Sequence, residues 1–465
     1  MSAGHVEEAA LEAALAGIRG EVVRKGEPGW DEARRVWNGM IDRAPEAIVR
    51  CTGTADVVAA LGWAREQGLP VSVRAGGHNV AGTAVVERGV VLDLGGMRSV
   101  RVDLERRTVR AGGGARLGDV DHETQAHGLA TPLGVVSRTG VAGLTLHGGM
   151  GFLTRRLGLS CDNLVSADVV TADGELLHVD AERHPDLLWA LRGGGGNFGV
   201  VTSFEYLLHD VGPEVFMVIT LYPAAAGEEL LLAFRDAMAQ APDELMALAI
   251  FWSAPHEEPV PPEWQGQPVF VAAGCWSGAL DVAEEAVRPL RELGEPVVDM
   301  SGPMPFAVAQ QLFDPEYPDG RRYYWKSIYL SELDAEAAAL CARAADGRPS
   351  PLSSIDVWAL GGALRREPEG GSAFSGRDKP FLVGLEANWD DPGEDDANLA
   401  WARDLYQALH EREPAGAYLN FPGFADEAAG LLRASFGASW DRLREVKARY
   451  DPENVFSSTL NIPPA

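Results

Sequence analysis

Residues 71–79 read Val-Ser-Val-Arg-Ala-Gly-Gly-His-Asn, a β-branched strand that runs directly into a glycine turn. A second buried strand is predicted over residues 90–94. Glycine after a strand lets backbone N–H groups approach a ligand closely, because a Cβ would clash there or forbid a positive φ. A diphosphate in a nest of backbone amides is the commonest ligand of this kind, and a simple tight turn is the alternative.

Short strands and glycine clusters alternate from this turn to residue 208. Further clusters lie at residues 112–114, 148–151 and 193–196. Several clusters in one region favour a phosphate nest over unrelated tight turns. Residues 194–199 (Gly-Gly-Gly-Asn-Phe-Gly) also have the spacing of a dinucleotide-binding motif, but they follow a helix predicted at residues 185–191 instead of a strand. This context argues against a Rossmann fold.

Composition narrows the class of protein. The 465 residues include 53 glycines and are 46% hydrophobic, enough for two or three domains with sizeable cores. With 40 basic and 68 acidic residues the net charge is −28, so we expect neither a nucleic-acid nor a membrane partner. The four cysteines are scattered without a C-x-x-C pair, and we expect no metal. The acidic N-terminal stretch does not resemble a signal peptide, which predicts a cytoplasmic protein; the oligomeric state stays open.

The sequence changes character after residue 208, where aromatic, strand-forming residues replace the glycine runs. We predict an α+β protein whose first domain, residues 1–208, opens on an amphipathic helix at residues 6–18. A second domain, residues 209–410, is expected to be an antiparallel sheet backed by helices. Its predicted strands are residues 215–222, 245–252, 269–276, 323–329, 355–360 and 381–389, and its predicted helices are residues 228–239, 282–293 and 334–345. The remaining residues 411–465 are expected to pack back onto the first domain.

Four motifs occur in order along nearly the whole chain. They are Arg-Ala-Gly-Gly-His-Asn at 74–79, Thr-Gly-Val-Ala-Gly-Leu-Thr-Leu-His-Gly-Gly-Met-Gly at 139–151, Asp-Leu-Leu-Trp-Ala-Leu-Arg at 186–192 with the glycine run to 199, and Tyr-Asp-Pro-Glu-Asn-Val-Phe at 450–456. Together they resemble the berberine-bridge-enzyme-like oxidases of the vanillyl-alcohol-oxidase flavoprotein superfamily. The resemblance implies an FAD-binding domain of that type, with the flavin ring facing the second domain.

The resemblance also implies how FAD is held. In this family the histidine of the first loop, His78 here, carries an 8α-linkage to the flavin. Many relatives add a second link from a cysteine just before the second glycine block, but residues 134–139 contain none and Cys161 lies too far along the chain, so we predict one covalent bond. The cofactor-binding residues implied are Arg74, Ala75, Gly76, Gly77, His78, Asn79, Thr139, Gly140, Gly143, Leu144, Gly148, Gly149, Gly151, Gly199, Val200 and Asn461.

Within the family, residues 31–43 and 136–140 resemble bacterial polyketide-tailoring members, notably the enterocin-pathway flavoenzyme. The resemblance places Thr139 near flavin N5, where oxygen reacts; shaping the turn is the equally weighted alternative. His147 stands where the family usually has glycine. It either reaches the ring or the substrate, or packs as a hydrogen-bonded histidine.

Two residues of the C-terminal half are further candidates for catalysis. Tyr418, in Tyr-Leu-Asn at 418–420, matches a family motif whose tyrosine faces the flavin ring. Its phenol requires nearby positive charge or hydrogen bonds to act as a base at neutral pH, and Lys326 is a candidate cation unless a salt bridge occupies it. Asp356 lies in an otherwise apolar strand, where related oxidases place an acid over the substrate. The aromatic residues Trp252, Trp276, Tyr324, Trp358 and Trp389 either line a broad pocket or fill the sheet core.

We therefore predict an FAD-dependent enzyme that oxidises a small organic, polyketide-like secondary metabolite, with O2 as electron acceptor or oxygen source. Its catalytic residues are expected to be Tyr418, Asp356 and Thr139. A sugar or alcohol oxidase with Tyr418 as base, and an oxidative ring-closing enzyme of the alkaloid- or cannabinoid-synthase type, are the alternatives. A flavin-carrying sensor without turnover is a different class that the sequence leaves open.

Overall fold

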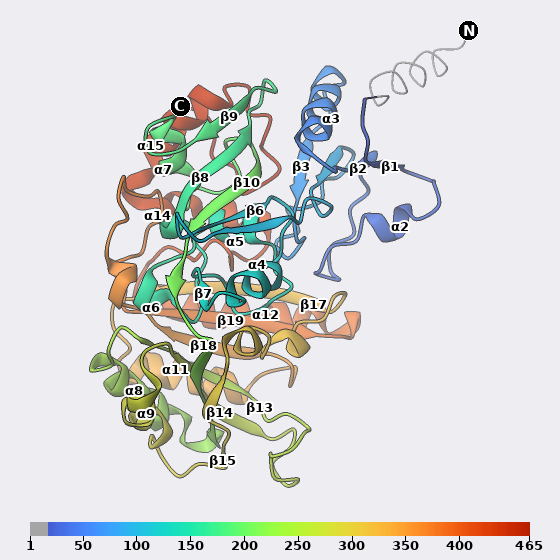
Figure 1. Ribbon diagram of the computed structural model, residues 1–465. Coiled ribbons are helices and arrows are strands. Elements are labelled where there is room, and N and C mark those ends of the chain that lie inside the picture. The colour runs from blue at the N-terminus through green and yellow to red at the C-terminus, as the bar shows by residue number, and fades with distance from the viewer. Residues whose placement is uncertain (1–16) are drawn as a thin grey trace.

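The computed structural model describes residues 17–465 and contains three principal sheets (Figure 1). Most of the opening helix expected at residues 6–18 therefore lies outside the described residues. The chain first builds two smaller sheets, drawn in blue and green, and then the large sheet of the second half. Mixed helices and antiparallel sheets confirm the predicted α+β class.

The first sheet carries the turn at residues 74–79. Its order is β1-β2-β4-β3, with β2, β4 and β3 parallel and β1 antiparallel at the edge. Helix α3 packs against it and ends before Gly68. The bounds are β1 Glu21–Arg24, α2 Trp30–Ala33, β2 Ala47–Arg50, α3 Thr54–Glu66, β3 Val71–Arg74 and β4 Val90–Asp93.

The second sheet is antiparallel, in the order β5-β6-β10-β8-β9. Its strands are β5 Val100–Asp103, β6 Thr108–Gly112, β8 Leu164–Val170, β9 Leu176–Val179 and β10 Val200–Leu207, and a short pair joins β7 Leu129–Ala130 to β11 His209–Asp210. The surrounding helices are α4 Leu117–Gln125, α5 Val141–Leu146, α6 Thr154–Leu157 and α7 Pro185–Leu191. The helix before the 194–199 glycine run is thus present, in agreement with the argument against a Rossmann fold.

The large sheet forms the second half, in the order β15-β12-β14-β13-β18-β19-β17, with β16 paired to β12, and every pairing is antiparallel. Its strands are β12 Glu214–Pro223, β13 Leu245–Ser253, β14 Pro268–Trp276, β15 Val298–Asp299, β16 Gly302–Pro305, β17 Arg322–Leu330, β18 Ser354–Ala359 and β19 Phe381–Trp389. Its helices are α8 Gly227–Ala239, α9 Ala283–Arg291, α10 Phe306–Ala309, α11 Ala335–Asp346 and α12 Asp395–Arg412.

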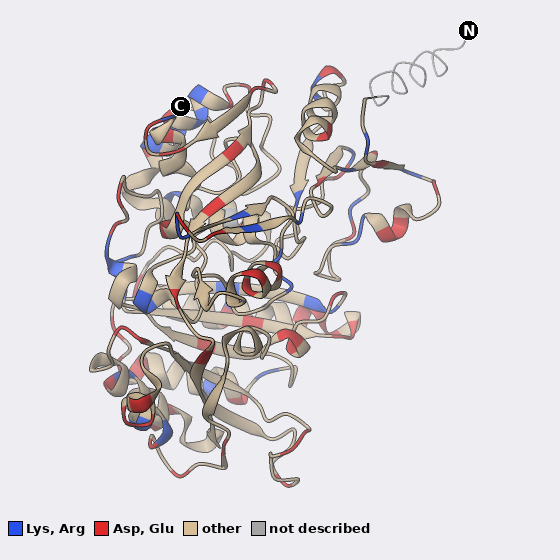
Figure 2. Cartoon of the chain, in the orientation of Figure 1, with Lys and Arg blue, Asp and Glu red and all other residues tan. Residues whose placement is uncertain are grey.

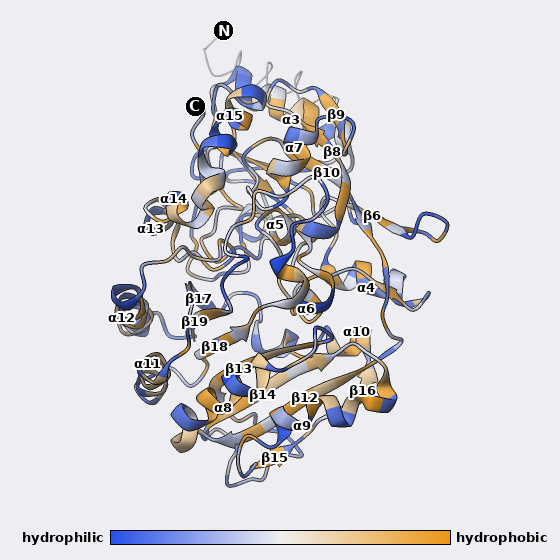
Figure 3. Cartoon of the chain, turned by 90° about the vertical axis from the view of Figure 1, so that its left-hand side faces the viewer, coloured by the Kyte–Doolittle hydropathy of each residue, from blue (hydrophilic) through white to orange (hydrophobic). Residues whose placement is uncertain are grey.

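Alternation along these strands separates two faces of the large sheet. In β13, Leu245, Ala247 and Phe251 belong to the core under α8, α9, α11 and α12, whereas Met246 and Leu248 belong to a core on the opposite face. Figure 3 shows β12 and β14 coloured largely hydrophobic, with these helices on one side. The opposite face meets the first half of the chain. Acidic residues lie mainly on helices and loops, and the strands contain few charged residues (Figure 2).

The C-terminal residues return to the second sheet. The helices there are α13 Ala425–Ala429, α14 Leu432–Phe436 and α15 Trp440–Tyr450, and α15 contacts α7. The buried ammonium of Lys447 donates to Asn197 O at 2.8 Å and pairs with Asp451 at 2.6 Å.

Division of the chain into domains at residues 208 and 410 remains our proposal. In the described part of the chain, no helix has the length and apolar character needed to cross a membrane.

Candidate functional site

A cavity lies where the loops of the first two sheets meet the large sheet. The volume of the cavity is about 240 Å³. One end is formed by residues of the segments 71–79, 134–147 and 456–459, in which Arg74 and Arg138 do not line the cavity. The other end is formed by β13, β17, β18 and β19 with residues 418–421. The cavity therefore joins the predicted cofactor loops to the sheet that carries Asp356.

Glycines bring the two cofactor loops into backbone contact. A Cβ on Gly76 would lie 2.4 Å from Gly140 N, and a Cβ on Gly140 would lie 2.5 Å from Gly76 N. A Cβ on Gly143 or Gly196, which also line the cavity, would meet no atom within 4 Å. Side chains there would occupy space that a ligand needs, which explains why these positions are glycine. These four glycines form a glycine cradle that can hold a long ligand containing a diphosphate, and FAD is such a ligand.

His78 lines the same cavity as a neutral imidazole. Burial, with the charges of Arg138 and Arg116, lowers its pKa to about 3. Its Nε2 atom is buried, and neither ring nitrogen forms a hydrogen bond with any residue in the range 17–465. A neutral ring with a free lone pair is the nucleophilic form of histidine. The residue therefore fits the attachment point that the family resemblance implies.

Ten of the predicted cofactor residues line the cavity: Ala75, Gly76, Gly77, His78, Asn79, Thr139, Gly140, Gly143, Leu144 and Gly199. Six do not: Arg74, Gly148, Gly149, Gly151, Val200 and Asn461. Arg74 is absent from the lining because its guanidinium pairs with Asp93 at 2.7 Å and donates to Ala33 O. Gly151 serves close packing, because a Cβ would lie 1.9 Å from Leu133 O.

Gly149 supports Tyr418 instead of lining the cavity. The Tyr418 hydroxyl oxygen accepts N–H groups from Gly149 at 3.2 Å, Met150 at 3.0 Å and Asn420 at 2.8 Å. Asn420 Nδ2 also donates to Leu144 O, which fixes the orientation of its amide. Burial raises the pKa of Tyr418 to about 12, and these three donors act against that rise because they favour phenolate.

Lys326 does not activate Tyr418 in this structure. Its ammonium is buried, forms a salt bridge with Glu427 at 2.9 Å and lies over the Tyr406 ring. The alternative reading of Lys326 as a salt-bridged strand residue is the one observed. Hydrogen bonds, and no lysine, therefore supply the stabilisation that a Tyr418 phenolate requires.

Asp356 lines the sheet end of the cavity together with Glu386, which the sequence interpretation missed. The two occupy neighbouring strands, with Asp356 opposite Gly384 and Glu386 opposite Ser354. Both are at least 95% buried, and Asp356 Oδ1 has no hydrogen-bond partner among the described residues. Burial raises the pKa of Asp356 to about 7, and burial plus the neighbouring Asp356 raises the pKa of Glu386 well above its ordinary value. At neutral pH the pair therefore carries at least one exchangeable proton.

Aromatic residues surround this acid pair. Trp252, Trp325, Trp358, Tyr317 and Phe421 line the cavity. Of the five aromatic candidates from the sequence, Trp252 and Trp358 lie here, whereas Trp276, Tyr324 and Trp389 fill the core on the opposite face of the sheet. In the described chain, the lining contains neither lysine nor arginine. The site is therefore apolar and acidic, with no fixed cation.

His147 lies at the rear of the cavity. Its Nδ1 contacts Gly143 O at 3.1 Å, and burial lowers its pKa, so Nδ1 carries the hydrogen and Nε2 is an acceptor. His147 and Tyr329 also line a separate hollow of about 10 Å³, and Nε2 of the first and Oη of the second are buried without a protein partner. Such a hollow is large enough for about one water. His147 thus has the hydrogen bond of the packing alternative and also lines the main cavity, so its contact with the ring or the substrate stays a prediction.

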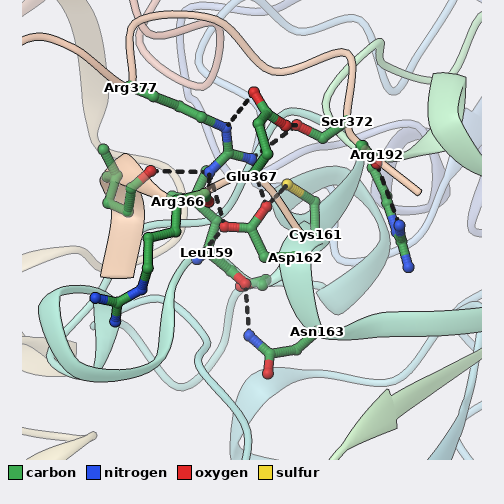
Figure 4. Close-up of polar contacts among 12 residues, drawn as sticks. Leu159, Cys161, Asp162, Asn163, Arg192, Arg366, Glu367, Ser372 and Arg377 are labelled. Carbon is green, nitrogen blue, oxygen red and sulfur yellow. Dashed lines mark hydrogen bonds and ion pairs between the residues drawn. The ribbon is translucent and has the colours of Figure 1, made fainter. Parts of the chain in front are cut away.

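A buried ion pair between Asp162 and Arg377 holds the segment around Phe374 at the rear of the cavity. Asp162 accepts two hydrogen bonds from Arg377 at 2.5 and 3.0 Å, and both side chains are 8% exposed (Figure 4). The Arg377 guanidinium also lies over Phe374, whose ring contacts Tyr418 edge to face. Cys161 sits beside this pair and is buried. Among the described residues, no cysteine lines the cavity and no cluster of side chains is arranged for a metal.

Comparison with known protein families supports this picture. An FAD binding domain model matches residues 45–180, and a model described as berberine and berberine like matches residues 417–463. The chain is 32% identical to the uncharacterized FAD-linked oxidoreductase YgaK of Bacillus subtilis over 96% of this chain and 97% of that protein. It is 31% identical to (R)-6-hydroxynicotine oxidase of Paenarthrobacter nicotinovorans, over 96% of this chain and 97% of that one.

A crystal structure of 6-hydroxy-D-nicotine oxidase from Arthrobacter nicotinovorans superposes with a TM-score of 0.86 at 29% identity, covering 96% of this chain and 98% of that one. The glycine cradle, the neutral histidine within it and these full-length relatives agree. The chain belongs to the berberine-bridge-enzyme-like FAD-linked oxidoreductases of the vanillyl-alcohol-oxidase superfamily.

Proposed function

We propose that this oxidoreductase carries FAD linked through His78 alone and oxidises a planar, polyketide-like small molecule, with O2 as electron acceptor or oxygen source. FAD, when bound, accepts two electrons from the substrate and delivers them to O2. The observation that carries the proposal is the meeting of His78, Tyr418 and the Asp356–Glu386 pair on one cavity. Placement beside the enterocin-pathway enzyme is part of this proposal and rests on the motifs at residues 31–43 and 136–140.

The single linkage is supported by the chemistry of the cavity wall. The neutral imidazole of His78 has an unpaired nitrogen, and residues 134–139, of which Gly134, Val135, Val136 and Thr139 line the cavity, contain no thiol. Thr139 lines the cavity beside Gly140. We propose that Thr139 lies next to the flavin and forms part of the wall along which O2 approaches.

Tyr418 is proposed to take a proton from the substrate. Three N–H groups surround its oxygen, so a negative charge formed there is stabilised where it develops. The substrate is proposed to approach the Tyr418 oxygen from the remaining direction, on the cavity side. A hydroxyl or an enol proton fits this arrangement equally well.

The Asp356–Glu386 pair is proposed to exchange a proton with an acidic C–H or enol of the substrate. A carboxyl whose pKa lies near the working pH is efficient in either direction. The tryptophans beside it favour a flat, apolar substrate body, and the lack of lysine or arginine among the described lining residues disfavours an anionic one. These features favour an enolisable, aromatic or polyketide-like molecule.

A sugar or alcohol oxidase is the second candidate, favoured by the Tyr418 oxygen with its three donors. A substrate panel separates the two. Under anaerobic conditions we expect 1,3-diketones and polyphenols to bleach the flavin absorbance, while oligosaccharides of similar size leave it unchanged. Bleaching by oligosaccharides alone would replace the first candidate with the second. Oxygen-18 labelling of the product then tells whether O2 ends as peroxide or in the product.

A further inference from the structure

Three aromatic rings form a stack that begins at His78. The Trp37 indole lies parallel to the His78 imidazole, with 4.2 Å between ring centres and 18° between planes. The same indole lies parallel to the Tyr323 ring, at 3.6 Å and 12°. Tyr323 belongs to β17 of the large sheet. The stack therefore connects the His78 loop to the second half of the molecule.

Trp37 is held from several directions. Its side chain is 2% exposed, and its Nε1 donates to Tyr317 O at 3.0 Å. Its backbone N–H donates to Gly77 O at 3.2 Å, next to His78, and its carbonyl accepts Gly320 N–H at 2.9 Å. The neighbouring Asn38 amide donates to Val80 O and Tyr323 O, each at 2.8 Å. The indole plane is thus fixed relative to the loop that carries the histidine.

His78 has no comparable anchor of its own. No hydrogen bond with residues 17–465 orients either ring nitrogen, and the adjacent Gly77 has a φ of 68°, a conformation that glycine tolerates best. A histidine ring is usually oriented by a hydrogen bond to one nitrogen. Here the face of Trp37 lies parallel against the imidazole, a contact that leaves Nε2 without a partner among the described residues.

We propose that Trp37 is a positioning residue for the covalent attachment of FAD to His78. This inference rests on the linkage proposed above. In that step a bond forms between an imidazole nitrogen and the 8α carbon of the flavin, and one hydrogen leaves each partner. The two electrons pass into the flavin ring and then to O2, which becomes H2O2. The stack contributes by holding the nitrogen in line with the carbon it attacks, where small misplacements slow a reaction strongly.

The experiment measures attachment apart from catalysis. Wild type, Trp37→Leu and Trp37→Phe are expressed with excess riboflavin, purified, and precipitated with acid, and the flavin in pellet and supernatant is compared. Intact mass gives the linked fraction independently, and incubation with added FAD gives the rate of linking. Trp63→Leu is the matched control, because Trp63 is buried on α3 in the same half of the molecule and packs in a different core.

We expect Trp37→Phe and Trp63→Leu to link FAD as wild type does, and Trp37→Leu to bind FAD but link it about tenfold more slowly or worse. Linking of Trp37→Leu at the wild-type rate would overturn the inference while leaving the His78 linkage intact. Release of all flavin from wild type would instead refute the linkage itself. Should Trp37→Leu fail to fold, Tyr323→Leu against Tyr323→Phe tests the outer ring: slower linking in the leucine variant alone supports the stack, and equal rates refute it.

Discussion

The Tyr317 hydroxyl donates a hydrogen bond of 2.7 Å to Glu386 Oε2 inside the cavity. Tyr317 comes from the segment between α10 and β17, whereas Glu386 belongs to β19. The bond stabilises the carboxylate of Glu386, while burial and the charge of Asp356 oppose ionisation. The position of a proton at the sheet end of the cavity therefore depends on the carboxyls of Asp356 and Glu386 and on the phenol of Tyr317.

Glu386→Gln is expected to leave the pH dependence of flavin reduction in place. Because Asp356 must be ionised to accept a proton, reduction should become faster as pH rises through its pKa of about 7. The charge of Asp356 raises the pKa of Glu386, so Glu386 is still protonated while Asp356 ionises, and a neutral glutamine in its place should shift the rise by less than about half a unit. Anaerobic stopped-flow reduction across pH 5–9 measures it. A rise shifted to lower pH by about one unit or more in the variant would show that Glu386 is charged while Asp356 ionises.

Asp356→Asn is expected to stabilise the protein in mild alkali. The pKa of Asp356 is raised from 3.8 to about 7 by burial, so the folded state holds a proton that the unfolded chain releases. Stability from this group is complete below pH 4 and is lost as pH rises toward 7 and above. Urea unfolding at pH 8 should therefore favour the variant by about 4 kcal/mol, with little difference at pH 4. Asp404→Asn, on the exposed side of α12, is the control, and equal effects of both substitutions would contradict the assignment.

Tyr418→Phe is expected to slow flavin reduction by about a hundredfold or more, because the substrate proton loses its acceptor. Binding of the substrate should change little, since the ring remains. Anaerobic reduction at saturating substrate gives the rate constant, and its dependence on concentration gives the binding constant. A variant that reduces its flavin at the wild-type rate would remove Tyr418 from the mechanism.

Arg377→Met is expected to destabilise the protein by about 3–5 kcal/mol, because it leaves the buried carboxylate of Asp162 without its partner. Arg50→Met provides the comparison: Arg50 pairs with Glu21 at the surface, with side chains 44% and 61% exposed. Its loss should cost less than about 1 kcal/mol. Urea unfolding of both variants decides the matter, and similar small losses would mean that Asp162 finds other partners in the variant.

Much of the fold could be predicted because the relevant signals are local. Periodicity and flanking glycine or proline gave the helix at residues 185–191 and the strand at 381–389 with the bounds that the structure has. Helix α12 had a usable signal that the interpretation did not use, since its buried residues Trp401, Leu405 and Leu409 recur at helical spacing. Glu386 was identifiable by the reasoning applied to Asp356, a lone charge within an apolar strand.

Other features depend on contacts between distant residues. The segment before β17 has no periodic pattern. Its place is set by hydrogen bonds that Asp314 accepts from the Ser137 N–H and that Tyr317 O accepts from Trp37 Nε1. Arg74 was assigned to the cofactor from its neighbours in the motif, but its guanidinium pairs with Asp93 of the neighbouring strand β4. Gly149 belongs to a genuine motif and yet serves Tyr418 through its amide. Sequence indicated which loops form the site, while side-chain direction required the structure.

The central claim is that one FAD is joined to the imidazole of His78. Mass spectrometry of the intact, denatured polypeptide tests it most directly, with His78→Ala measured beside wild type. The account predicts a wild-type mass exceeding that of the polypeptide by one FAD less two hydrogens, and a His78→Ala mass equal to that of its polypeptide alone. A wild type without the added mass, or a His78→Ala variant that keeps it, would contradict the account.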